Sequence, residues 1–165
     1  VYVLWSAWPV VREWRRLPPG QGAAWWLGVT TLALLSCAGL QQTDRGARDV
    51  LRAALLYIPL AAVQVVWLFG FLWPRVRSAW AMVAMFALFH LPNAPLMAAT
   101  ALAGGGWILL YRRWPNPALL TLSHAALAAA FQQLLGLSTR VGPGYLDPAH
   151  HAFRQSLQLA GWPLP

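Results

Sequence analysis

Long blocks of apolar residues without any charge, separated by short polar or proline-containing breaks, organise this chain. Residues 23–40 form the first block, after the breaker Pro18-Pro19-Gly20, and residues 53–73 form the second. Eighteen helical residues rise about 27 Å, close to the roughly 30 Å hydrocarbon thickness of a bilayer. The blocks also lack the alternation of apolar and polar residues that a membrane β-strand requires, so they predict transmembrane helices.

A third apolar stretch, residues 78–111, is too long for one crossing, because a single helix of that length would measure about 50 Å. Two prolines and an asparagine in His90-Leu91-Pro92-Asn93-Ala94-Pro95 predict that it breaks there. Gly104-Gly105-Gly106 predicts a close helix approach in its second half. The sequence therefore predicts an all-α polytopic transmembrane bundle of about five membrane helices, at residues 23–40, 53–73, 79–90, 95–111 and 118–137.

Three regions follow from these blocks. Residues 1–22 are expected to form an interfacial N-terminal segment, because its apolar start carries Trp5 and Trp8 and its Arg residues follow that start, unlike a secretory signal. Residues 23–137 form the transmembrane helical domain. Residues 138–165 are a polar C-terminal tail, with a short amphipathic helix expected near residues 151–159.

The composition supports a membrane location. Of 165 residues, 59% are hydrophobic and only 10% are charged, and the mean hydropathy is +0.50. A water-facing core of this size could not hide so much apolar surface, which excludes an ordinary soluble enzyme. The single cysteine, Cys37, lies inside an apolar block and allows no intrachain disulfide.

The charge pattern points to lipid rather than to nucleic acid. The formal net charge is +8, and all twelve basic residues are Arg, placed in short groups beside the apolar blocks rather than in one patch. Counted by alternating sides of the membrane, seven Arg lie on the N-terminal side and five on the other, which favours a cytoplasmic N-terminus. We expect an integral protein of a bacterial inner membrane, cytoplasmic or intracytoplasmic. Its expected partners are membrane lipids and other integral membrane proteins, with no nucleic acid.

Histidines are the candidate chemical groups, because His90 and His124 lie inside apolar segments. An ionisable side chain at membrane depth is costly and usually faces a protein interior with a partner. A structural hydrogen bond to a carbonyl explains either residue alone, whereas two such residues near helix ends favour a shared site. His150 and His151 fall in the tail, where a solvated surface pair is the simplest interpretation and metal binding a minor alternative.

Three segments together resemble a known family: residues 70–76 (GFLWPRV), 86–93 (FALFHLPN) and 114–125 (WPNPALLTLSHA). Their order and spacing are similar to the core of the CPBP family of intramembrane proteases, which includes the CAAX prenyl endopeptidases and bacteriocin-processing proteins. The resemblance covers about residues 64–135. It implies a CPBP-like helical core in which the two histidines share a centre.

The resemblance also implies a lost catalytic site. Family members carry a Glu-Glu-x-x-x-Arg motif whose glutamate, with the first histidine, activates water for attack on a peptide bond. Aligned on Gly70, those positions are Gln64, Val65 and Phe69 here. An amide such as that of Gln64 cannot act as a general base.

The last motif is incomplete as well, since His124 is followed by Ala128 where the family has Asn or an equivalent oxyanion donor. The acidic residues of the chain lie outside the predicted helices; they are Glu13, Asp44, Asp49 and Asp147. We therefore expect Gln64, His90 and His124 to approach one another as a relic of a catalytic centre, with no catalytic residue assigned. The binding positions predicted around them are Phe86, Asn93, Trp107 and Ala128.

Three functions remain open from the sequence. The first is a non-catalytic CPBP-like pseudoenzyme that acts as a subunit or as an assembly or stabilising factor of a larger membrane complex. The second is a divergent but active intramembrane endopeptidase. The third is a pigment-associated subunit of a photosynthetic or respiratory complex, in which His90 or His124 is the axial ligand of a chlorophyll-type pigment amid the eleven Trp. Otherwise no cofactor is expected; two histidines fall short of the three protein ligands usual for catalytic zinc.

Overall fold

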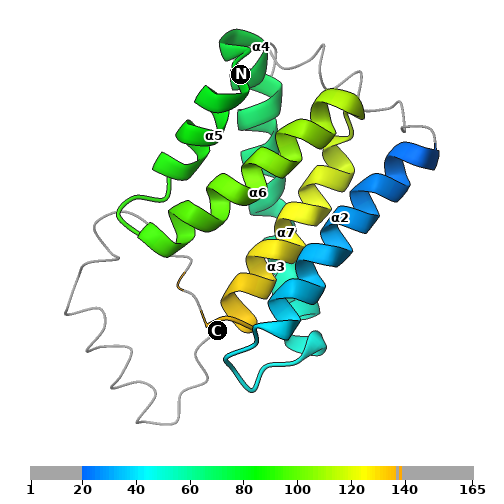
Figure 1. Ribbon diagram of the computed structural model, residues 1–165, viewed down its shortest axis with the longest axis vertical. Helices are drawn as coiled ribbons and strands as arrows, with labels where there is room; N and C mark the ends of the chain where they lie inside the picture. The colour runs from blue at the N-terminus through cyan, green and yellow to red at the C-terminus, as the bar shows by residue number, and fades with distance from the viewer. Residues whose placement is uncertain (1–19, 137, 139–165) are drawn as a thin grey trace.

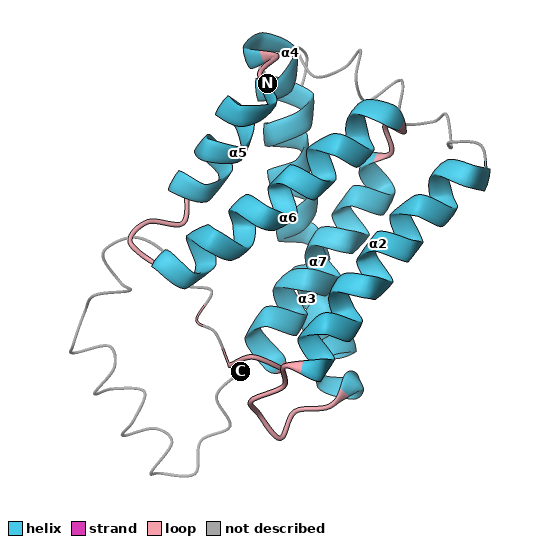
Figure 2. Cartoon of the chain, viewed as in Figure 1, coloured by secondary structure: helices cyan, strands magenta, loops and turns pink. Residues whose placement is uncertain are grey.

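The computed structural model describes residues 20–136 and Ser138, and this part of the chain is helical, without strands (Figure 2). The predicted all-α fold is confirmed. Apart from residues 20–22 and Ser138, the expected interfacial segment and polar tail lie outside the described residues. The elements are α2 (Gly20–Gly39), α3 (Ala47–Val65), the π-helix η1 (Val66–Leu72), α4 (Trp73–Val76), α5 (Ala79–Leu88), α6 (Ala94–Arg113) and α7 (Pro117–Gln133).

Within residues 20–136, three helices are long and apolar enough to cross a membrane: Gly22–Gly39, Ala47–Val76 and Ala94–Arg113. The second of these joins α3, η1 and α4 into one continuous helix of 30 residues. The other two helices are shorter, since α5 has 10 residues and α7 has 17. This pattern fits an integral membrane protein.

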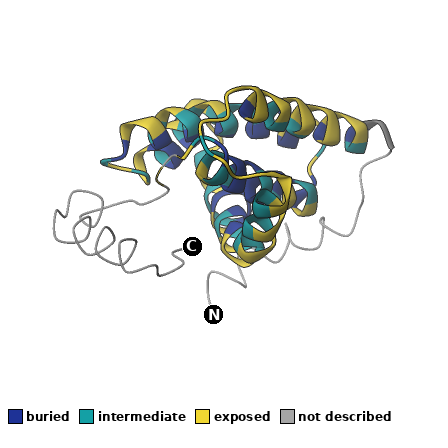
Figure 3. Cartoon of the chain, turned by 90° about the horizontal axis from the view of Figure 1, so that it is seen from below, coloured by how far each residue is buried: buried dark blue, intermediate teal, exposed yellow. Residues whose placement is uncertain are grey.

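The helices pack mainly in two groups, one of α2, α7 and α3 and the other of α5 and α6. Helix α7 lies between α2 and α3, and α5 packs along α6 (Figure 1). The outer faces of the bundle carry exposed apolar side chains, while the buried residues face inward (Figure 3). Trp80 on α5 and Leu102 on α6, for example, are 85% and 80% exposed. Such faces would be unstable in water but suit contact with lipid or with another membrane protein.

The helix starts are set by short polar side chains and prolines. The Ser78 hydroxyl accepts a hydrogen bond from the Ala81 amide at 3.3 Å, and the Asn93 and Asn116 side chains cap α6 and α7 in the same way. Each cap satisfies a backbone N–H that has no partner within the helix. Pro95 and Pro117 occupy the first turns of α6 and α7, where proline is tolerated. The predicted break at residues 90–95 is therefore a helix end followed by a new capped start.

The seven residues Val66–Leu72 form a π-helix inside the long second helix, a feature that the apolar pattern does not predict. Its wider turn is visible where the Trp73 amide donates to the Leu68 carbonyl, five residues back. Leu68, Phe69 and Gly70 in this segment are buried. The widened turn thus brings consecutive side chains into the core, where a regular α-helix would present only one stripe.

Gly104 is the residue of the predicted glycine run at which helices meet closely. A Cβ atom built on Gly104 would lie 3.0 Å from Cδ1 of Phe86 on α5, whereas one on Gly105 or Gly106 would meet nothing within 4 Å. The expected close approach of helices therefore depends on one glycine of the three.

Replacing Gly104 by Ala should destabilise the protein relative to the matched variant Gly105→Ala. The added methyl group of Gly104→Ala presses on a buried Phe86 ring, and overpacking of this kind costs about 1–3 kcal/mol. In Gly105→Ala the added methyl group meets no neighbouring atom, and alanine has a higher helix propensity than glycine. This variant should therefore be neutral or stabilising by up to about 1 kcal/mol. Thermal unfolding of both variants in a mild detergent checks this. Equal unfolding temperatures would contradict the assigned contact between α5 and α6.

Candidate functional site

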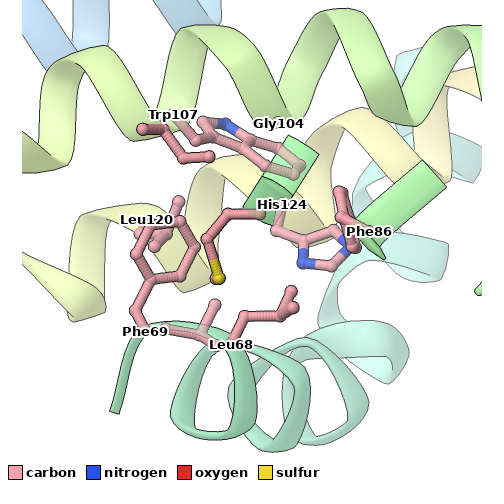
Figure 4. A pocket seen from close by; sticks show the side chains of 10 residues that line it. Leu68, Phe69, Phe86, Gly104, Trp107, Leu120 and His124 are labelled. Carbon is pink, nitrogen blue, oxygen red and sulfur yellow. The ribbon is translucent and has the colours of Figure 1, made fainter. Parts of the chain in front are cut away.

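His124 lies at the centre of the bundle, buried on α7 within a group of aromatic rings. The centroid of its ring lies 4.8 Å from that of Trp107 on α6, 5.6 Å from Phe86 on α5 and 5.9 Å from Tyr57 on α3. Figure 4 shows His124 facing Phe86, with Trp107 and Gly104 on one side and Leu68 and Phe69 on the other. These side chains leave a void of only about 10 Å³. The imidazole is thus held by ring packing from three helices.

Next to His124, Ser123 joins three helices through its hydroxyl group. The Trp107 indole N–H donates to Ser123 Oγ at 2.9 Å, and the Thr30 hydroxyl of α2 donates to the same oxygen at 2.8 Å. The two bonds provide partners for polar groups inside the apolar bundle. Sequence reasoning missed this network; its one signal is a Ser in the apolar helix directly before His124.

His90 lies in the turn after α5 and is half-buried. Its Nδ1 is 2.7 Å from the Phe86 carbonyl oxygen, and its ring packs edge-on against the Phe86 ring at 5.1 Å. This is the carbonyl hydrogen bond that a purely structural role would require. The bond occupies Nδ1, so Nε2 is the ring nitrogen that can meet another group.

The two histidines, for which the sequence favours a shared site, line the same small cavity of about 40 Å³. Tyr57, Thr100 and Ala128 also line it. Ala128, expected at the position of the oxyanion donor, therefore faces the histidine pair but offers only a methyl group.

Gln64 lies in a second and larger cavity, of about 260 Å³, which it shares with His90. Tyr57 lines this cavity too, so Tyr57 and His90 border both spaces. The Tyr57 hydroxyl group interacts with the Gln64 side chain, while Gln64 Oε1 is buried without a hydrogen-bond partner. The three residues predicted to form a relic site are thus arranged around two cavities with His90 between Gln64 and His124. Tyr57 is the member that the sequence did not identify.

The predicted binding positions divide into two kinds. Phe86 and Trp107 pack on His124, and Ala128 lines the cavity of the histidine pair. Asn93 has a different place: its Oδ1 accepts from the Leu96 amide at 3.2 Å, and its Nδ2 donates to the Ser138 carbonyl at 2.6 Å. Asn93 caps α6 and lines neither cavity.

No carboxylate lines these cavities within the described part of the chain. Val65 and Phe69, the residues expected from the resemblance at Glu and Arg positions, are buried in the apolar core beside His124. Asp44 precedes α3, and Asp49 lies in its first turn, where its carboxylate accepts from the Gly46 amide at 3.1 Å. Residues 20–136 also contain no group of three His, Cys, Asp or Glu side chains that could hold a metal ion.

Replacing Ser123 by Ala should destabilise the protein by about 1–3 kcal/mol, because it leaves the buried Trp107 indole N–H unpaired. Ser36→Ala is the matched control: Ser36 is exposed and donates only to the Leu32 carbonyl of its own helix, so its loss should cost little. Thermal unfolding in detergent measures both. Equal effects of the two substitutions would contradict the role of Ser123 in joining α2, α6 and α7.

The described site is therefore a group of neutral polar side chains, Tyr57, Gln64, His90 and His124, enclosed by aromatic rings. It can donate and accept hydrogen bonds, but it provides no anionic base. No protein-family model, curated protein or solved structure matches this chain.

Proposed function

We propose that this chain is a non-catalytic integral membrane protein with a CPBP-like core, which acts as a subunit or as an assembly or stabilising factor of a larger membrane complex. The observation that carries the proposal is that two close histidines lie near the amide of Gln64, at the position where a protease of the resembled family would need a carboxylate. His90 and His124 share one cavity, and Gln64 shares the next with His90. In the family that the sequence resembles, a glutamate acts with the first histidine to activate water, and the Gln64 amide at that position cannot accept a proton.

The dimensions of the helices support a role within a complex. Helix α5 has 10 residues and rises about 15 Å, half of the hydrocarbon thickness. Its exposed face nevertheless carries large apolar side chains, with Trp80 the most exposed of them. A helix that ends within the membrane leaves polar backbone near lipid unless another protein covers it. The α5 face is therefore where we place the partner.

The chain, purified with an affinity tag from its native membrane in mild detergent, should be recovered with at least one other integral membrane protein at a fixed ratio. Trp80→Ala should reduce that recovery several-fold, because exposed Trp residues at interfaces carry much of the binding free energy. Leu102→Ala is the matched control on α6 and should leave the recovery unchanged. Quantitative mass spectrometry of the purified sample measures the ratio.

Two outcomes would contradict the proposal. One is recovery of the chain alone as a monomer. The other is cleavage of a membrane peptide by the reconstituted protein that His90→Ala abolishes, which would instead support the active endopeptidase. If the double variant Gln64→Glu, Val65→Glu also shows no cleavage, the active endopeptidase is left without support.

We further propose that the protein belongs to a bacterial inner membrane, with its N-terminus in the cytoplasm. Helix α4 and the end of α6 lie at the same end of the bundle (Figure 1), and their four described Arg are accompanied there by no described acidic residue. The opposite end, before and within the first turns of α3, mixes Arg with Asp. The excess of Arg favours the cytoplasmic side for the first end. The residues are Arg75, Arg77, Arg112 and Arg113 at the first end, and Arg45, Arg48, Arg52, Asp44 and Asp49 at the other.

Single cysteines in a Cys37→Ala background should report this orientation. In intact spheroplasts, a membrane-impermeant thiol reagent should label Arg48→Cys, and it should label Arg77→Cys only after permeabilisation. The reverse pattern of labelling would show that the N-terminus lies on the outer side.

A further inference from the structure

The larger of the two cavities opens toward the lipid-facing surface. It measures about 260 Å³, and three of its lining residues, Leu60, Trp67 and Phe89, are 50%, 39% and 52% exposed. These residues come from α3, from η1 and from the turn after α5. In a membrane, the mouth of this pocket therefore faces hydrocarbon. A ligand must enter from the lipid phase, so it must be membrane-soluble.

The depth of the pocket restricts the ligand further. Gln64 lies near the middle of the continuous helix Ala47–Val76, far from the Arg residues at either end. Charged phospholipid head groups stay at the membrane surface, because moving a charge to the bilayer centre is costly. Among residues 20–136, no charged side chain lines the pocket to compensate that cost. The ligand is therefore uncharged.

The polar groups of the pocket can both donate and accept hydrogen bonds. Gln64 Oε1 is a buried acceptor without a partner, and its carboxamide also carries two donors. The Tyr57 hydroxyl adds a donor, and His90, with Nδ1 held by the Phe86 carbonyl, presents Nε2. A ligand that uses all three needs more than one oxygen atom on a compact head.

Aromatic side chains form much of the remaining wall. Trp67, Phe86 and Phe89 surround the polar groups, and the Trp67 ring stacks on Phe71 at 4.8 Å, which holds it in place. Flat aromatic walls favour a flat ring, because stacked rings gain more interaction free energy than the burial of their surface area alone provides. The volume is near the lower end of ligand pockets, which suits one ring and leaves a tail outside.

We propose that this pocket binds the head group of an uncharged, membrane-soluble ring compound that bears oxygen atoms on opposite sides, the chemistry of a quinone or quinol, with its apolar tail passing between Leu60 and Trp67 into the lipid. The Tyr57 hydroxyl donates to one ring oxygen, and the Gln64 carboxamide, which carries both donors and an acceptor, bonds to the other. The inference rests on the proposed function in one respect, since it takes the cavity as a binding site and not as a site of cleavage.

The test uses the purified full chain in lipid nanodiscs and a decyl-substituted benzoquinone as the probe. Retained probe is measured by absorbance against protein-free nanodiscs of the same lipid. Saturable binding near one molecule per chain is expected. Gln64→Leu and His90→Phe should each weaken it at least about threefold, as the loss of one hydrogen bond does. Gln132→Leu, at an exposed position on α7, is the matched control and should not change binding.

A second probe and a second kind of variant keep the test decisive. Decylbenzene, which has the ring and the tail but no oxygen, should bind at least about tenfold more weakly than the quinone. Leu60→Trp, at the half-exposed mouth, should block binding without disturbing the core, which an unchanged unfolding temperature would verify.

The proposal is overturned by retention equal to that of protein-free nanodiscs, by equal binding of the two probes, or by equal effects of Gln64→Leu and Gln132→Leu. Because the chain is tested alone, such a failure leaves the subunit role standing. Conversely, recovery of the chain as a lone monomer would leave the binding result standing.

Discussion

An imidazole buried in an apolar bundle is the constraint on which the arrangement of these helices depends. His124 has ring contacts from α3, α5 and α6, so its position couples these three helices. The close approach at Gly104 lets Phe86 reach the imidazole, and the adjacent Ser123 secures Trp107. Packing around one polar residue thus sets the relative positions of helices that are far apart in the sequence.

The helices themselves were predictable because their causes are local. Charge-free blocks fixed their approximate lengths, and the Pro and Asn residues around positions 92–95 and 115–117 fixed two of their starts. The meeting of His90 and His124 was also expected, since an ionisable side chain inside an apolar segment usually faces a partner in the protein interior. The expected position of His124 near a helix end is wrong, because it lies at the middle of α7 (Pro117–Gln133). In the structure both residues line one cavity.

The remaining parts of the site depend on three-dimensional contacts that no local pattern encodes. Tyr57 borders both cavities, but in the sequence it is one aromatic residue within an apolar block. The bonds of Thr30 and Trp107 to Ser123 link positions 93 and 16 residues apart. Asn93, expected at a binding position, instead caps α6, since an amide just before a helix has a backbone N–H to satisfy. The π-helix arises within a uniformly apolar run, where hydropathy carries no information on turn width.

That wide turn changes how the chain can vary. A π-turn holds about one residue more than an α-turn, so removing one residue from Val66–Leu72 would let the segment become an ordinary α-helix while the parts on either side keep nearly the same relative orientation. Removing one residue from a regular α-helix, by contrast, rotates its two parts by about 100° relative to each other. The π-helix is therefore the place in Ala47–Val76 that tolerates a change of chain length by one residue, and such a change would disturb the consecutive burial of Leu68, Phe69 and Gly70 rather than the position of Gln64.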